Sequence, residues 1–165
     1  MRTLQHWLDD YGQHHQNKTN KAIHWICIPV IFFSSLGLLA SIPHHFLLEL
    51  IGKDNTQISP YVHFGSIVIL FALVFYIRLS ITMALGMLLW SLFCLWGNVQ
   101  LEIQEPFGLV LWQISLILFG IAWAVQFIGH KIEGKKPSFF NDIQFLLIGP
   151  AWLLHFIYKK VGVKF

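Results

Sequence analysis

Four long apolar runs constrain this chain more than any other feature of its sequence. They cover residues 24–42, 61–77, 79–96 and 107–128. A helix needs about 20 mostly apolar residues to cross the hydrocarbon core of a bilayer, so each run is close to a spanning length. We therefore expect an all-α polytopic membrane helix bundle with about four transmembrane helices, formed by residues 1–165 as a single integral membrane domain.

The composition agrees with a lipid environment. Charged residues make up 12% of the chain and apolar residues 56%, and the mean hydropathy is +0.62. A soluble domain carries about 25% charged residues, and half that content does not cover a water-exposed surface. The net charge of +3 is small and no basic stripe is present, which argues against a nucleic-acid partner.

Two further segments flank the four runs. Residues 1–23 are polar and predict a cytoplasmic N-terminal segment with an amphipathic helix, because a secretory signal would become apolar much earlier. A fifth apolar run, residues 143–158, is shorter, and we expect Gly149 and Pro150 to break it. A run of that length favours a re-entrant or interfacial segment over a spanning helix.

The basic residues predict the orientation. With the N-terminus in the cytoplasm and four crossings, ten of the eleven Lys and Arg residues fall on the cytoplasmic side, and only Lys53 lies outside. Cytoplasmic loops are enriched in Lys and Arg, so we expect both termini in the cytoplasm. The ten residues are Arg2, Lys18, Lys21, Arg78, Lys131, Lys135, Lys136, Lys159, Lys160 and Lys164.

Nine histidines are unusual in so apolar a chain. In this threading His15, His24, His130 and His155 lie near helix ends on the cytoplasmic side and come from different parts of the chain. Ionisable residues at a membrane edge often mark a functional site, and imidazole is the commonest metal ligand among side chains. A histidine-rich set with little carboxylate suits iron, zinc or copper. We predict a metal centre held by these four residues.

Other polar residues receive secondary roles. Glu133 follows His130 by one helical turn and is expected either to bind the metal or to orient its ligands. Asn20 is a further polar candidate beside the histidines. His6 and His14 are assigned to the solvated side of the N-terminal helix, and His44 to the opposite membrane face.

Two sequence signatures resemble those of a known membrane family. The first is Tyr11-x3-His15-x4-Asn20-x3-His24-x4-Pro29, and the second is Trp123-x2-Gln126-Phe127-Ile128-Gly129-His130, followed by Glu133 and Pro137. Both resemble the family that contains the fungal 2-hydroxy fatty acid dioxygenase. The ending from Gly149 to His155 is similar to its bacterial branch, which implies a bacterial inner-membrane protein.

The resemblance implies an iron(II)-dependent dioxygenase of fatty acid α-oxidation. Such an enzyme would use O2 to shorten a long-chain 2-hydroxy fatty acid by one carbon, with Fe(2+) as its cofactor. The histidines named above would bind the metal, and Asn20 and Glu133 would orient the ligands or the substrate. The alkyl tail would lie between helices, among the membrane lipids. The stretch from His130 to Pro137 is one residue shorter than in the fungal pattern.

Three alternatives remain open from the sequence. The same histidines could hold zinc and activate water in a membrane lipid hydrolase. Paired histidines could instead bind haem in an electron carrier. A non-enzymatic membrane scaffold is the third alternative. Metal analysis and an absorption spectrum distinguish among them.

Overall fold

The computed structural model describes residues 2–51, 58–135 and 144–165, and every regular element in these ranges is helical. The all-α membrane bundle expected from the sequence is therefore confirmed. The elements are α1 (Leu4–Gln13), α2 (Lys18–Ala40), α3 (His45–Ile51), η1 (Ser59–Tyr61), α4 (Phe64–Leu79), α5 (Ile81–Gln104), η2 (Pro106–Gly108), α6 (Leu111–Glu133) and α7 (Phe145–Val161).

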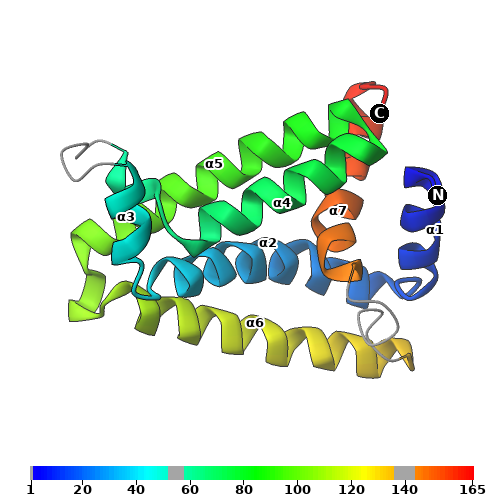
Figure 1. Ribbon diagram of the computed structural model, residues 1–165. Coiled ribbons are helices and arrows are strands. Elements are labelled where there is room, and N and C mark those ends of the chain that lie inside the picture. The colour runs from blue at the N-terminus through cyan, green and yellow to red at the C-terminus, as the bar shows by residue number, and fades with distance from the viewer. Residues whose placement is uncertain (1, 52–57, 136–143) are drawn as a thin grey trace.

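The helices α2, α4, α5 and α6 run back and forth and form the body of the protein (Figure 1). Among the described residues, α2, α5 and α6 are long and apolar enough to cross a membrane, and α4 is a shorter apolar helix. Many of their outward-facing side chains are large and apolar, such as Phe71, Leu89 and Ile121, which are 73%, 69% and 60% exposed. Such surfaces fit lipid as the surrounding solvent.

Each of the four helices extends beyond one end of its predicted apolar run and falls short of the other end. α2 begins at Lys18, because the Asn17 side chain accepts hydrogen bonds from the amides of Thr19 and Asn20 and caps the helix there. α5 continues to Gln104 and α6 to Glu133. The apolar run predicts only the part of the helix that faces lipid. Backbone hydrogen bonds continue the helix into the polar residues at its end.

One end of the bundle gathers several distant parts of the chain. α1, α7, the start of α2, the α4–α5 turn and the end of α6 all lie there (Figure 1). This arrangement puts the described basic residues near one end, as the predicted threading requires; Lys53 and Lys136 lie outside the described residues. Pro137 of the second signature lies outside them as well.

The structure of α7 differs from the expectation that Gly149 and Pro150 break the fifth apolar run. α7 is a continuous helix with Pro150 inside it. Proline removes one helical hydrogen bond, and packing around α7 offsets this loss. The Tyr76 hydroxyl donates to the Leu147 carbonyl at 2.6 Å, and the Tyr158 hydroxyl donates to the Thr82 carbonyl at 2.9 Å. These bonds fix α7 across the end of the bundle, against α4 and α5.

The closest helix pair is α2 with α6. At Gly37 of α2, an added Cβ would collide with Ser115 Oγ of α6 and with Asn98 Oδ1 of α5. Small residues at helix contacts are the usual means of close packing inside a bilayer.

The Gly37 contact predicts a stability difference between two glycines. Gly37→Ala should destabilise the protein by about 1–3 kcal/mol, the usual cost of overpacking. Gly120→Ala is the control, because nothing lies within 4 Å of an added Cβ at that helical position. Thermal unfolding of both variants in the same detergent would measure the difference, and equal midpoints would contradict this account of the α2–α6 contact.

The threading predicts the results of reporter fusions. Fusions after Arg78 and after Lys164 should report the cytoplasm, and a fusion after Gln104 should report the opposite side. The physical reason is the gathering of basic residues at the end that holds α1 and α7. A C-terminal fusion that reports the outside would show that α7 crosses the membrane.

Candidate metal centre

Three histidines from separate elements meet at the end of the bundle that carries α1 and α7. His15 lies in the connection between α1 and α2, His24 in the second turn of α2, and His130 in the last turn of α6. Their exposed fractions are 0%, 1% and 5%. One ligand atom from each lies within 4.8 Å of the others, so the three form a group able to hold a metal ion.

Backbone carbonyls orient two of these rings. His15 Nδ1 lies 2.8 Å from the Tyr11 carbonyl oxygen, and His24 Nδ1 lies 2.9 Å from the Asn20 carbonyl oxygen. A carbonyl oxygen only accepts, so both Nδ1 atoms carry the proton and donate it. Each Nε2 is thereby left with a lone pair, which is the usual arrangement of a metal-bound histidine. His15 Nε2 is buried without a hydrogen-bond partner.

The third ring completes the arrangement. His24 Nε2 and His130 Nε2 are 3.2 Å apart. Two imidazole nitrogens that share a metal at about 2.0–2.1 Å are roughly 2.8–3.4 Å apart for bond angles between square and tetrahedral values. The unpartnered His15 Nε2 and this short separation fit a transition-metal ion. If no metal is bound, His130 Nε2 would carry a proton and donate it to His24 Nε2.

The environment keeps His15 neutral. Burial, together with the nearby His24, lowers the pKa of His15 from its ordinary value of 6.5 to about 3. Desolvation penalises the imidazolium form, so the lone pair of Nε2 is not lost to protonation near neutral pH.

Glu133 is not among the grouped ligand atoms. We call it the Glu133 clamp, because its hydrogen bonds hold together the segments that carry the histidines. Its two carboxylate oxygens accept hydrogen bonds from the amides of Gln16 and Asn17, both at 2.8 Å, and from the Asn20 side-chain amide at 3.1 Å. These bonds tie the end of α6 to the connection that carries His15. Gly129 permits the approach, because a Cβ there would lie 2.5 Å from Asn20 Oδ1.

His155 is not brought to the other three histidines. Its Nδ1 donates to the Trp152 carbonyl at 2.7 Å, and its ring packs against Phe156 and Phe165. The group of ligand atoms within 4.8 Å among the described residues contains His15, His24 and His130 without it. His155 is buried, and its ring contributes to packing around α7.

Two other histidines lie outside this group. His14 was assigned to the solvated side of its helix, yet its Nδ1 is buried without a partner and it interacts electrostatically with His130. His63, at the opposite end, caps α4 by accepting from the Gly65 amide. The adjacency of His14 to His15 was the only signal available for the first.

Aromatic rings close one side of the centre. The Tyr11 ring stacks on His15 with centroids 4.3 Å apart, and Trp152 lies 5.4 Å from the same ring. α1 and α7 therefore shield the histidines from water. Tyr11 and Trp152 both belong to the sequence patterns described above, although nothing in the sequence showed that they meet.

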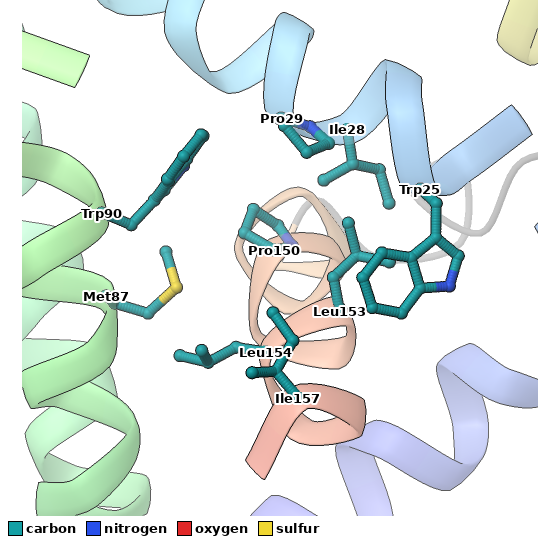
Figure 2. Close-up of a pocket in the computed structure, with 9 residues that line it drawn as sticks. All are labelled: Trp25, Ile28, Pro29, Met87, Trp90, Pro150, Leu153, Leu154 and Ile157. Carbon is teal, nitrogen blue, oxygen red and sulfur yellow. The ribbon is translucent and has the colours of Figure 1, made fainter. Parts of the chain in front are cut away.

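Two apolar cavities lie between the helices, and the larger one adjoins the centre. The larger has a volume of about 360 Å³, and its wall includes His24 and His130. The smaller, about 150 Å³, lies between α2, α5 and α7 (Figure 2). Ile28 and Pro150 border both cavities, but the smaller cavity has no histidine in its wall.

The fold and the site together define a polytopic helical membrane protein with a buried three-histidine centre and an adjoining apolar cavity. The comparisons with known proteins give the family. The chain belongs to the Mpo1-like family, described as 2-hydroxy-palmitic acid dioxygenase Mpo1-like, whose model matches residues 1–161. The resemblance noted in the two signatures is thereby confirmed.

A curated relative agrees with this assignment. The 2-hydroxy-palmitic acid dioxygenase of Saccharomyces cerevisiae is 25% identical over 161 residues, which cover 96% of this chain and 82% of the yeast protein. No solved structure matches the chain.

The Glu133 clamp predicts a change in metal affinity. Glu133→Ala should weaken metal binding by about 10–100-fold, the usual effect of removing a group that orients metal ligands. Competition with a chelator would measure this affinity. Glu102→Ala, an exposed acidic residue at the far end of α5, is the matched control and should bind metal as the unaltered protein does. Equal affinities for all three proteins would rule out the clamp.

Proposed function

We propose that this protein is an iron(II)-dependent dioxygenase that shortens long-chain 2-hydroxy fatty acids by one carbon. The observation that carries the proposal is the set of three buried imidazoles with ligand nitrogens close together, two of which line an apolar cavity. The name of the family and that of its yeast relative supply the reaction. The family name does not specify the metal; the histidine donors suit iron, zinc or copper, and we propose iron(II) because a dioxygenase reaction requires a redox-active metal.

In this proposal His15, His24 and His130 hold the iron through nitrogen ligands. Three protein ligands leave coordination positions open, which non-haem iron oxygenases use for substrate and O2. When bound, iron(II) supplies the redox chemistry that activates O2. The Glu133 clamp and the two backbone carbonyls keep the imidazoles in place, and Tyr11 and Trp152 exclude water.

The substrate's polar head would meet these histidines. A 2-hydroxy acid offers a carboxylate and a neighbouring hydroxyl, two oxygens suited to one site. Gln126 lies one turn before His130 and also lines the cavity, so its amide can donate to the carboxylate. In the balanced reaction the bond between the first two carbons breaks, and O2 accepts four electrons. The products are the shorter acid, carbon dioxide and water.

The location of the protein is part of the proposal. We place it in a bacterial inner membrane, with both termini and the histidine centre on the cytoplasmic side. The spanning helices and the clustered basic residues support this placement. Substrate would then reach the centre from the lipid phase, with its head group at the membrane surface.

The proposal predicts the effect of removing a ligand. His24→Ala or His130→Ala should abolish conversion of a 2-hydroxy fatty acid to the shorter acid, because each removes one of three metal ligands. Mass spectrometry of the products and an oxygen electrode would follow the reaction. The iron content of anaerobically purified protein should fall in the same variants.

The control is His44→Ala, a histidine at the opposite end of the bundle. It should keep both turnover and iron. An equal loss in this variant would indicate general destabilisation and remove support for the site. Full turnover by the metal-free double variant His24→Ala/His130→Ala would refute the mechanism, and stoichiometric zinc with ester hydrolysis would instead favour a lipid hydrolase.

A further inference from the structure

The larger cavity follows two antiparallel helices away from the histidines. On α2 it is lined at intervals of three or four residues, and the same holds on α6, so each helix gives one continuous face to it. The α2 stripe is His24, Ile28, Ile31, Ser35 and Leu39, and the α6 stripe is His130, Gln126, Trp123 and Phe119. The cavity is therefore elongated along the bundle axis.

Its length matches a long acyl chain. With a rise of 1.5 Å per residue, Leu39 lies about 22 Å from His24 along α2. α6 runs beside the same space from His130 to Phe119, about 16 Å along its axis. A cavity of this form is long and narrow, since its volume is about 360 Å³.

The cavity has one polar end. His24, His130 and Gln126 lie at the end near α1 and α7, whereas the far end is formed by Leu36, Leu39 and other apolar side chains. An amphiphile with a small polar head and a single long tail has the same polarity. Its head would point to the histidines and its tail to the far end.

Lipid has access to this cavity. Val68 of α4 and Leu146 of α7 both line it, and each is 45% exposed at the surface of the bundle. A tail can therefore enter sideways from the bilayer without crossing water.

The smaller cavity does not offer the same fit. Its wall consists of the nine side chains drawn in Figure 2, among them Pro29, Trp90 and Leu153, and it includes none of the metal-centre histidines. A tail lying there would have no polar group of the centre at either end. The acyl chain belongs to the larger cavity.

We propose that the larger cavity binds the substrate's acyl chain and that its far end, at Leu39, sets the longest chain accepted. This inference rests on the proposed function, because the head group is held by the metal centre. Chain length is then measured along α2, from His24 to the side chain that closes the cavity.

The test is a pair of tryptophan substitutions in the holoenzyme. Leu39→Trp should fill the far end and reduce kcat/KM for the longest 2-hydroxy fatty acids by about tenfold, the effect of forcing extra groups into a packed apolar space. Short chains should be converted at the normal rate, which also shows that the variant is folded. Leu38→Trp is the matched control, because Leu38 is the neighbouring residue of the same type and does not line the cavity.

A substitution at a second position tests whether the accepted chain length follows the distance from His24 along α2. Ser35 also lines the cavity and lies about 6 Å closer to His24 along α2. Ser35→Phe should shorten the accepted chain further than Leu39→Trp, by about four or five carbons at the spacing of an extended chain. The same order should appear in dissociation constants for the acid series, measured with the metal-loaded protein without O2.

The outcomes separate the two proposals. An unchanged length profile in Leu39→Trp, or an equal change in Leu38→Trp, overturns the assignment of the cavity. If the unaltered protein converts none of the acids, the proposed function fails. The binding series then decides the cavity assignment alone: the ordered cut-off supports it, and equal binding of all lengths by all variants overturns it.

Discussion

The structure depends on the meeting of buried imidazole nitrogens between α2 and α6. His24 Nε2 and His130 Nε2 lie 3.2 Å apart in a region almost closed to solvent. Buried polar groups are costly unless each has a partner, so the two helices can pack this closely only if the histidine nitrogens share a proton or a ligand. The proposed metal would satisfy both nitrogens and also His15 Nε2, which is otherwise unpartnered.

The remaining elements hold that contact in place. Glu133 joins the end of α6 to the connection before α2, and Gly37 and Gly129 leave room for side chains of the neighbouring helices. α1 and α7 cover the centre with aromatic rings, and hydrogen bonds from Tyr76 and Tyr158 hold α7 against α4 and α5. The apolar cavity lies next to this cover, and its wall includes two of the grouped histidines and the partly exposed Val68 and Leu146.

The sequence predicted the helical membrane class, and it predicted three of the grouped histidines together with His155. Its argument for the four was that they lie near helix ends on one membrane side. That argument predicts how deep a residue lies in the membrane. It predicts neither the lateral position of the residue nor the rotation of its helix about the helix axis. His155 lies in the expected segment, yet its ring contacts Phe156 and Phe165 and does not join the other three histidines. His14, one residue before His15, was misplaced for the same reason.

By itself, the sequence determined which segments are apolar enough to lie in lipid, how basic residues are distributed among the connections, and which family the two signatures resemble. These properties follow from the order of residues along the chain. Hydropathy and charge then decide only which segments lie in the membrane and which side each connection faces. Only the tertiary structure decided that His15, His24 and His130 converge, that Glu133 binds backbone amides, and that Pro150 lies within a continuous helix. Those outcomes depend on side-chain packing between helices, which sets their rotation and separation and which no single segment encodes.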